Sequence, residues 1–450
     1  MKTHSLFAVV LMAGFAAPAF GADEFPAKLA GHALLPAETY IDAPSDAPDD
    51  LKISGKFTGA KRIDAVGSVM GKSVGRPTGV SLPFQGQPVQ GHSGIKVMQD
   101  GTFWLLTDNG FGSKANSPDA MLFLTRYAVD WQTGKFDRKE TVFLSDPDKV
   151  IPFRIANEGT KTRYLTGSDF DTEGFQPIGQ SMWIGDEFGP FLIETDMSGK
   201  VKGVYDTMVD GKVVRGPDNP ALQLPGAPDA KMPEFTAKRS KGFEGLAASP
   251  DGSKLYGLLE GPLWSVEKSA YETGPDGKTV LRILEFDVAK KAWTGRFWYY
   301  PLEAASHAIG DYNMISPTQG LIIERDNGEG TADKACPEGQ RREDCFHDLA
   351  KFKRVYKIEL TDANAGGPMR KIGYIDLMNI QDPDNKARKP KVNGVLSFPF
   401  FTIEDVDMID ASHIVVGNDN NLPFSSSRDP NKADDNELIL LEVPEFLAAK

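Results

Sequence analysis

The chain has 450 residues, of which 40% are hydrophobic, so it can bury a large core and is not disordered as a whole. Its 50 lysines and arginines stand against 63 acidic residues. The resulting net charge of −13 argues against a general nucleic-acid-binding protein and favours cationic partners such as metal ions. The 45 glycines and 31 prolines follow no triplet period, which excludes collagen and indicates a fold with many turns.

The first segment is typical of an export signal. Lys2 and His4 precede an apolar stretch from Leu6 to Ala17, and small residues follow it. We predict a signal peptide over 1–21, cleaved after Gly21, and a mature protein that is periplasmic or secreted. The apolar stretch is shorter than the ~20 residues that a membrane anchor needs, so we expect no membrane span.

After this segment we expect an N-terminal extension over 22–50 and one β-rich domain over 51–450. One unit recurs in the domain: an apolar run with glycine and a polar or acidic residue, a turn, and an apolar run that ends in acid or amide. Each copy has the signature of a β-hairpin, and a further strand pair follows it. The five copies cover 91–110, 171–187, 242–261, 310–327 and 401–420.

Four strands per unit, repeated radially, predict an all-β fold: a β-propeller with about five or six four-stranded blades. A strand over Glu437–Glu442 follows the last copy, and an early strand from Ile53 to Val66 has no hairpin of its own. We expect these N- and C-terminal strands to pair and close the ring, because closure removes an exposed sheet edge. A β-sandwich with long loops is the alternative.

Cys336 and Cys345 are the two cysteines of the chain, nine positions apart in a polar loop. In an oxidising compartment this spacing predicts a local disulfide that closes one loop. A zinc site would need two further ligands, and His347 is the only histidine nearby.

Acidic residues recur at equivalent positions of the copies. Inner propeller strands line a central channel, so carboxylates from different blades would converge there. Converging anions raise one another's pKa and require positive charge, and hard oxygen ligands suit Ca²⁺, with Mg²⁺ as the alternative. The acids could instead cap turns by accepting backbone N–H bonds. The recurring acids are Glu173, Glu244, Asp311 and Glu404 before the turns, and Asp108, Asp186, Glu187, Glu260, Glu324, Asp326 and Asp419 after them.

From this set we predict two overlapping groups of site residues, with Asn109 at their rim. We expect His92 to take the position that Glu has in other copies, where it would be hydrogen-bonded to a channel acid or act as a ligand. A nucleophile at Ser93 is the alternative, although its surroundings lack the G-x-S-x-G frame. The expected metal ligands are Glu173, Asp186, Glu244, Glu260, Glu404, Asp419 and Asp108. The expected catalytic residues are Glu173, Glu187, Glu244 and His92.

Basic residues are fewer. Arg325 and Arg76 could each clamp a phosphate or pair with the surplus acids. Lys238, Arg239 and Lys241 precede the third copy, and we expect them to lie in a solvated loop.

Two segments resemble a known family. Ser168–Phe175 (SDFDTEGF) and Trp183–Pro190 (WIGDEFGP) are similar to the exported bacterial phytase-like proteins, the family with the "esterase-like activity of phytase". Gly242–Leu246 and Thr107–Gly110 also fit. The resemblance extends from about Gly79 to Val443. It implies a phytase-like β-propeller domain, export, and hydrolysis of a phosphoester or a carboxylester.

We therefore expect an exported, monomeric, metal-dependent hydrolase that acts on a small anionic ester, such as a phosphoester, through an acid-lined central channel. One alternative is a lactone or carboxylester hydrolase, which needs a neutral substrate pocket. The other is a non-catalytic binding or scaffold propeller, whose metal would only hold the ring closed.

Overall fold

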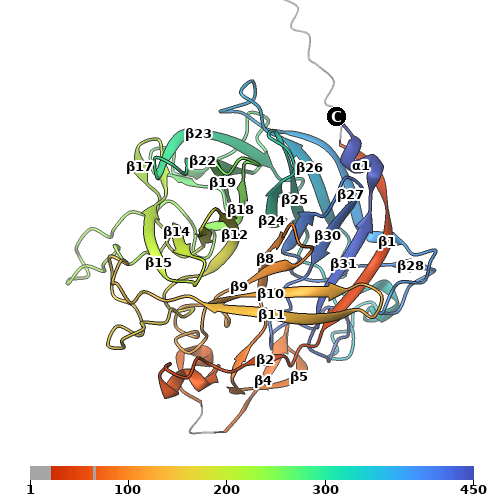
Figure 1. Ribbon diagram of the computed structural model, residues 1–450, viewed down its shortest axis with the longest axis horizontal. Helices are drawn as coiled ribbons and strands as arrows, with labels where there is room; N and C mark the ends of the chain where they lie inside the picture. Colours follow the sequence, from red (N-terminus) through yellow and green to blue (C-terminus); the bar gives the residue numbers. More distant parts are fainter. Residues whose placement is uncertain (1–21, 64–66) are drawn as a thin grey trace, which may run out of the picture.

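The computed structural model describes residues 22–63 and 67–450. The predicted signal peptide with its cleavage site, and the last residues of the early strand expected up to Val66, lie outside these ranges. The sheets are arranged around a common centre (Figure 1), and the α-helix in the described residues is the short α1 (Pro444–Ala448). The chain is an all-β propeller, as predicted.

Five four-stranded units can be traced in the described residues. Each passes through antiparallel neighbours from an inner strand to an outer one. The first three units are separate sheets: β8 (His92–Val97), β9 (Phe103–Thr107), β10 (Phe123–Asp130) and β11 (Lys135–Phe143); β12 (Thr172–Ile178), β13 (Ser181–Asp186), β14 (Phe191–Asp196) and β15 (Val201–Asp206); β18 (Phe243–Ala248), β19 (Lys254–Leu259), β22 (Val280–Asp287) and β23 (Ala292–Pro301).

The last two units share one nine-stranded sheet, in which their outer strands are paired. The fourth unit is β24 (Ala308–Met314), β25 (Gln319–Arg325), β26 (Lys353–Glu359) and β27 (Arg370–Gln381), with β28 (Val395–Leu396) beside β27; the fifth is β29 (Asp405–Met408), β30 (His413–Gly417), β31 (Asn436–Glu442) and β1 (Asp23–Leu35).

Within residues 22–63 and 67–450, the loops carry short two-stranded ladders and three turns of 3-10 helix. The ladders pair β2 (Tyr40–Ile41) with β7 (Gln87–Pro88), β3 (Ile53–Ser54) with β6 (Phe84–Gln85), β4 (Val69–Ser73) with β5 (Arg76–Leu82), β16 (Met208–Val209) with β17 (Lys212–Val213), and β20 (Trp264–Ser265) with β21 (Ala270–Tyr271). The 3-10 turns are η1 (Asp49–Lys52), η2 (Thr58–Ala60) and η3 (Ala332–Lys334).

The ring is closed by β1, which pairs antiparallel with β31 and parallel with β27. The N- and C-terminal strands therefore do pair, but the prediction that the strand from Ile53 does so is wrong. Ile53 lies in β3 and pairs with β6. The closing strand comes from the segment 22–50, expected to be an extension. Its buried positions include Ala27, Leu29 and Ala33. The alternation of buried and more exposed positions is hard to recognise in the sequence, because several of these residues are small and have low strand propensity.

The hydrophobic core is divided among the faces between neighbouring units, as sheets stacked around an axis require. Leu106 and Leu124 of the first unit, for example, pack with Phe175 and Ile184 of the second. Similar clusters join Trp183 to Phe286, Leu258 to Ile322, Ile323 to Val406, and Val415 to Ile95, which completes the circle.

A buried polar cluster fastens β1 to β31. Glu437 of β31 binds Arg428 through two hydrogen bonds, Nε to Oε1 at 2.9 Å and Nη2 to Oε2 at 2.6 Å, and His32 of β1 lies 3.0 Å from Oε2 through Nε2. His32 and Glu437 are almost completely buried. Burial opposes ionisation of Glu437, but Arg428 and His32 outweigh it and lower its pKa to about 2.

Replacing this glutamate tests the fastening. We expect Glu437→Gln to lower the free energy of unfolding by about 3–5 kcal/mol at neutral pH, because Arg428 would be left buried without its counter-charge. The pKa of Glu437 falls from 4.5 to about 2 on folding, so its contribution is complete above about pH 4.5 and is lost toward pH 2. The variant should lose less stability than the natural protein over that range in urea titrations.

Glu442→Gln is the matched control on the same strand. Glu442 is exposed and binds Lys28 at 3.2 Å, a pair expected to contribute less than about 1 kcal/mol. Equal destabilisation by the two substitutions would contradict the special role of Glu437.

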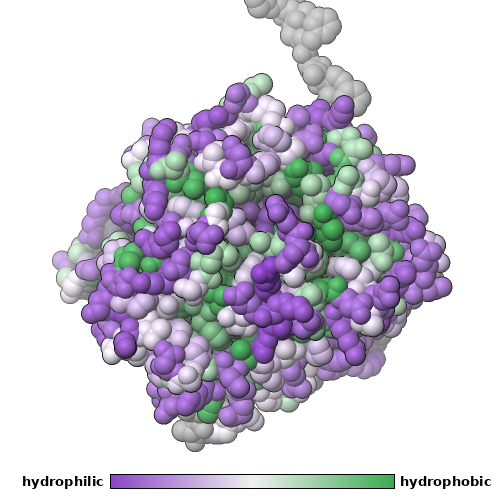
Figure 2. All heavy atoms as spheres, viewed as in Figure 1, coloured by the Kyte–Doolittle hydropathy of each residue, from purple (hydrophilic) through white to green (hydrophobic). Residues whose placement is uncertain are grey.

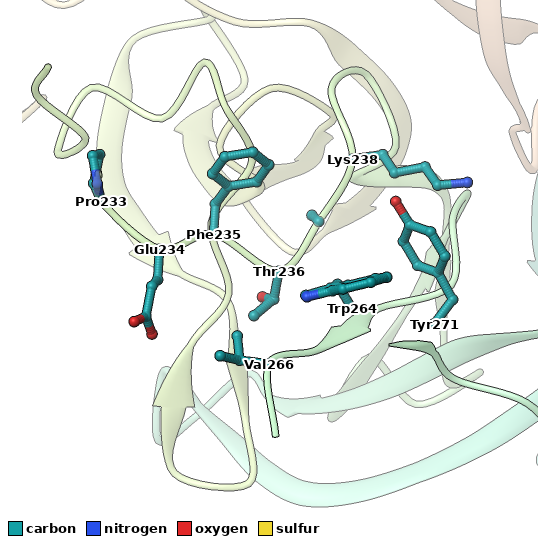
Figure 3. Close-up of a pocket in the computed structure, with 9 residues that line it drawn as sticks. Pro233, Glu234, Phe235, Thr236, Lys238, Trp264, Val266 and Tyr271 are labelled. Carbon is teal, nitrogen blue, oxygen red and sulfur yellow. The ribbon is translucent and has the colours of Figure 1, made fainter. Parts of the chain in front are cut away.

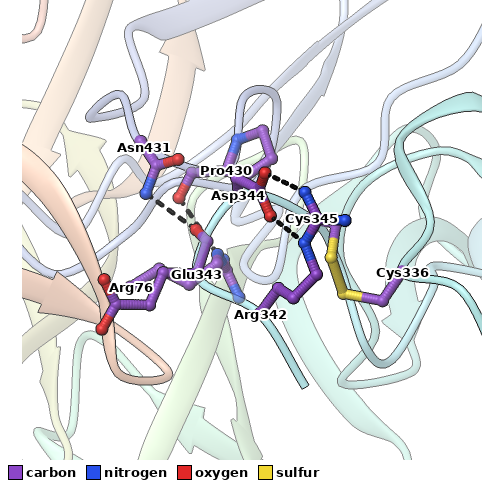
Figure 4. Close-up of a disulfide and its surroundings, with 8 residues drawn as sticks. All are labelled: Arg76, Cys336, Arg342, Glu343, Asp344, Cys345, Pro430 and Asn431. Carbon is purple, nitrogen blue, oxygen red and sulfur yellow. Dashed lines mark hydrogen bonds and ion pairs between the residues drawn. A yellow bond between two sulfur atoms is a disulfide. The ribbon is translucent and has the colours of Figure 1, made fainter. Parts of the chain in front are cut away.

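Cys336 and Cys345 form a disulfide with a Cα–Cα distance of 4.9 Å, as predicted. Figure 4 shows the loop that it closes beside Asn431, whose side-chain amide donates to the carbonyl of Glu343 at 2.8 Å. The face in Figure 2 is mostly hydrophilic, with apolar side chains in small groups. In the described part of the chain, no helix is both long and apolar enough to cross a membrane.

Candidate active site

The inner strands of four units each carry a β-bulge that includes a glycine. Extra residues at a bulge bend the strand, and glycine allows another backbone to come close. The bulges lie between His92 and Ile95 in β8, between Glu173 and Phe175 in β12, between Phe243 and Gly245 in β18, and between Ile309 and Tyr312 in β24.

These glycines are required by the contact between neighbouring units. Gly174 has φ +48°, and a Cβ added to it would lie 2.5 Å from the backbone nitrogen of Leu246 in the next unit. A Cβ added to Gly245 would lie 2.7 Å from the Cβ of Tyr312 in the unit after that. The Glu-Gly pairs therefore recur because the glycine is needed for packing, and each glutamate is carried to the same contact.

Carboxylates from several units meet there in two groups of three that share Glu244. Ligand oxygens of Glu173, Glu244 and Glu404 all lie within 4.8 Å of one another, and so do those of Glu187, Glu244 and Glu260. Glu173, Glu187, Glu244 and Glu404 are buried, with 6–7% of their surface exposed, and the side chain of Glu260 is 6% exposed. The predicted convergence of these acids is therefore present in the fold.

Two basic groups face these acids. The guanidinium of Arg325 lies 3.2 Å from Oε1 of Glu404, and the ammonium of Lys241 forms an ion pair with Glu260. Negative charge still exceeds positive charge at this place, because further acids interact electrostatically with the two triads. The group of interacting acids, here called the acid cluster, consists of Asp108, Asp171, Glu173, Glu187, Glu244, Glu260, Glu404 and Asp419.

The excess of negative charge shifts the pKa values of the acid cluster. Burial, and then repulsion by neighbouring acids, raises the pKa of Glu173 and Glu187 well above its usual range. The same causes raise the pKa of Asp171 to about 7. Lys241 reverses the effect of burial on Glu260 and lowers its pKa. Glu187 and Glu260 interact directly, and the pKa of Glu187 is raised whereas that of Glu260 is lowered.

These properties fit a bound divalent cation. Every donor in the two triads is a carboxylate oxygen, the ligand type that Ca²⁺ and Mg²⁺ prefer. Without a cation the acids must retain protons, whereas a cation would replace those protons and satisfy oxygens from several units at once. Among the predicted ligands, Glu173, Glu244, Glu260 and Glu404 lie in the triads.

The other predicted ligands have different surroundings. Asp186 accepts three backbone N–H bonds, from Asp171 at 2.9 Å, Gly189 at 2.7 Å and Phe191 at 3.3 Å, so it holds a turn. Asp108 and Asp419 also accept backbone N–H bonds, yet both interact electrostatically with Glu404. They lie at the edge of the acid cluster rather than within a triad.

Ser93, rather than His92, takes the position of the bulge glutamates. Ser93 directly precedes Gly94, and its hydroxyl donates to Oε2 of Glu404 at 3.1 Å. The expectation for His92 is therefore wrong by one residue, because the bulge sets which side chain faces the acids. His92 is completely buried, which lowers its pKa to about 3, and neither ring nitrogen has a partner among the described residues.

Three recurring acids lie in other networks. Glu324 binds His307, Tyr300 and Lys371, and Asp326 binds Lys353 at 3.0 Å. Asp311 accepts the backbone N–H of Val406 at 3.1 Å and the side-chain amide of Asn313 at 3.1 Å. Of the basic candidates, Arg76 is buried against Glu329 at 2.7 Å, whereas Arg325 faces the acid cluster.

Two members of the site were missed from the sequence. Asp171 begins the second repeat, but its pairing with Asn109 and Glu187 depends on the fold. Lys241 is not part of a merely solvated loop, because it pairs with Glu260, and the surrounding acids raise its pKa although burial opposes this. An isolated lysine in a polar segment carries no signal for such a partner.

A cavity of about 460 Å³ adjoins the acid cluster, and Lys241, Glu260 and Arg325 belong to its wall. Lys238 and His307 also line it, so much of the rim is basic. The Nε of Arg325 is buried with no hydrogen-bond partner in the described residues.

A second cavity of about 400 Å³ lies beside the first, and the two share Lys238 and Tyr271. Figure 3 shows Phe235, Trp264 and Tyr271 around it; the indole of Trp264 meets the ring of Tyr271 edge-on at 4.9 Å. The ammonium of Lys238 lies 4.2 Å from the centre of the Tyr271 ring. The cavity next to the acids is thus continued by a more aromatic one.

The charge of the acid cluster predicts a pH-dependent effect of metal. When folding raises the pKa of a carboxyl group, the folded protein loses stability as the pH rises from the ordinary pKa of that group to the raised one. For Asp171 this window runs from 3.8 to about 7. We expect the metal-free protein to lose stability over this range, and Ca²⁺ to raise Tm more at about pH 8 than at about pH 5, as measured by thermal unfolding with chelator or excess Ca²⁺.

Glu244→Gln supplies the corresponding variant. It should raise the metal-free Tm, because it removes one of the repelling charges, and should abolish most of the increase caused by Ca²⁺. Glu442→Gln, on the surface of β31, should change neither quantity. An equal Ca²⁺ response in Glu244→Gln and the natural protein would contradict a cation at the triads.

Comparison with known proteins adds a family. A model of the phytase-like family, described as having the esterase-like activity of phytase, matches residues 87–422. The matched segment includes every residue of the acid cluster, from Asp108 to Asp419.

One curated relative is an uncharacterized secreted protein of Arthroderma benhamiae, 29% identical over 130 residues, which are 26% of this chain and 24% of that protein. This chain therefore spans about a quarter of the length of that relative. Similar solved structures include the arabinanase of Bacillus subtilis, with 9% identity, TM-score 0.35, and coverage of 78% of this chain and 93% of that one. Another is the periplasmic gluconolactonase of Pseudomonas aeruginosa, with 10% identity, TM-score 0.29, and coverage of 78% and 88%. TM-scores this low support no conclusion about chemistry.

Proposed function

The chain belongs to the phytase-like family, and from this premise we propose that it is a metal-dependent hydrolase of phosphoesters or related anionic esters. One observation chiefly supports the proposal: the two carboxylate triads adjoin a cavity whose wall includes Lys241 and Arg325. Acids that can hold a cation and bases that can hold an anion thus lie side by side.

The acid cluster would hold the metal. Glu173, Glu244 and Glu404 would form one position, and Glu187 and Glu260 would join Glu244 at a second one. When bound, Ca²⁺ or Mg²⁺ would polarise an ester oxygen and lower the pKa of a water molecule. Glu187 is the proposed general base at the second position, because Glu260 there is already paired with Lys241 whereas Glu187 has no ion pair with a described residue.

The basic wall would bind the substrate. Arg325 and Lys241 both line the cavity, and Lys241 is partly exposed, so their positive charges can attract anionic oxygens bound there. Because each base is also paired with an acid of the cluster, substrate binding and metal binding would be coupled through Glu404 and Glu260.

Hydrolysis of a lactone or carboxylester is the second candidate. The aromatic cavity lined by Phe235, Trp264 and Val266 favours it, because a neutral apolar group would be stabilised there by leaving water. The two candidates differ in the charge of the group beside Arg325.

We also propose that the protein is exported. Three observations support this: the signal-like N-terminal segment, the disulfide between Cys336 and Cys345, and the relative that is described as a secreted protein. Disulfides persist in oxidising compartments such as the periplasm and the extracellular space.

The test is hydrolysis of p-nitrophenyl phosphate and p-nitrophenyl acetate by the purified mature protein, with Ca²⁺, with Mg²⁺ and with excess chelator. We expect turnover of the phosphate that the chelator abolishes and Ca²⁺ restores. Glu244→Gln should lower kcat/KM by on the order of 100-fold or more. Arg325→Gln should raise KM for the phosphate far more than for the acetate.

The control is Glu442→Gln, which should retain full activity. Preference for the acetate, with little effect of Arg325→Gln, would favour the carboxylester reading. Metal-dependent stabilisation without turnover of either substrate would count against an enzyme and favour a scaffold propeller.

A further inference from the structure

His307 lies in the wall of the cavity beside the acid cluster, although it does not belong to the cluster. Its Nδ1 is 2.9 Å from Oε1 of Glu324. Its ring packs on Phe352, with 4.2 Å between the centres and 36° between the planes, and its backbone N–H donates to Ala304 at 3.0 Å. The imidazole is therefore held in one orientation by a carboxylate and an aromatic ring.

Glu324 is itself fixed. It is fully buried, and besides His307 it receives a backbone N–H from Glu303 at 2.7 Å, the hydroxyl of Tyr300 at 2.8 Å and the ammonium of Lys371 at 2.8 Å. Burial opposes its ionisation, but His307 and Lys371 outweigh burial and lower its pKa. An ionised Glu324 can only accept, so Nδ1 of His307 carries a hydrogen and donates it.

The other ring nitrogen, Nε2, is the one that could transfer a proton. No described residue forms a hydrogen bond with Nε2 of His307. The side chain is 11% exposed and lines the same cavity as Arg325 and Glu260. In the imidazolium form Nε2 carries the second proton of the ring, and this nitrogen could pass it to a group bound in the cavity.

Another histidine of the chain shows what a purely structural arrangement looks like. His32 also meets a buried glutamate, Glu437, but both of its ring nitrogens are used, since Nδ1 accepts the backbone N–H of Arg388 at 3.1 Å. His32 is fully buried, away from solvent. His307 differs from it, because Nε2 has no partner among the described residues and the side chain lines a cavity.

We propose that His307 is a catalytic proton donor to the leaving group of the ester, and that Glu324 is its positioning residue. This inference rests on the proposed hydrolysis. Water attacks the phosphorus or carbonyl carbon and gives its proton to a carboxylate of the acid cluster. The bond to the leaving oxygen breaks with its electron pair, and that oxygen takes the Nε2 proton of His307. Proton exchange with solvent restores both groups.

The test compares leaving groups that differ in their need for a proton. p-Nitrophenolate departs readily as an anion, whereas phenolate is more basic and gains more from protonation. We expect His307→Ala to lower kcat for phenyl phosphate by roughly 10²–10⁴-fold, and to lower kcat for p-nitrophenyl phosphate by less than about 10-fold. If the protein prefers carboxylesters, the corresponding acetates are used. The increase of Tm with Ca²⁺ should be unchanged, because His307 is not part of the acid cluster.

His307→Gln keeps the size of the side chain and should show the same bias if His307→Ala fails to fold. Glu324→Gln should show a smaller bias in the same direction. The matched control is His413→Ala: His413 also places Nδ1 3.0 Å from a carboxylate, that of Asp410, but at an exposed hairpin turn, and its removal should affect neither substrate.

Equal loss on both leaving groups, or no loss, would overturn the role of His307 while the proposed hydrolysis stands. No metal-dependent turnover by the natural protein on any of these substrates would overturn both. The two failures are therefore distinguishable.

Discussion

Contact between neighbouring inner strands is the constraint on which the rest of this structure depends. The strands meet so closely that residues such as Gly174 and Gly245 cannot carry a side chain without displacing the backbone or side chain of the next unit. The bulges that contain them turn the preceding residue toward the same region. In two units that residue is a glutamate, so the packing requirement and the collection of charge have one cause.

The carboxylates that this packing brings together repel one another, and their repulsion destabilises the same contact between strands. Glu173, Glu187 and Glu244 repel one another in a buried place, and Lys241 and Arg325 neutralise part of the charge. Protons can make up the difference at low pH, and a divalent cation could do so at neutral pH. Stability and any metal-dependent chemistry would then be properties of the same oxygens, which come from separate blades. Removing one acid would change both.

The sequence allowed the repeated hairpins, the disulfide and the glutamates of the two triads to be predicted, because each depends on local pattern: turn residues, cysteine spacing and Glu-Gly pairs. Other features depend on register or on distant partners. A shift of one residue at the bulge places Ser93 rather than His92 toward Glu404. Asp186 and Asp171 are both acidic, but only the fold shows that the first holds a turn. The closing strand β1 was not predicted, because its alanines obscure the alternating pattern of a strand. The partner of Lys241 was not predicted either, because the two residues are distant along the chain.

The closure by β1 has a consequence for the order in which the molecule can be assembled. Asp23 pairs with Gly373 and Lys28 with Glu442, so β1 is synthesised well before the two strands that it joins. Until β27 and β31 have been made, β1 lacks both partners and the ring stays open. A polypeptide that is threaded through a membrane before it folds loses nothing by this delay, since β1 and its partners reach the far side before the last sheet forms.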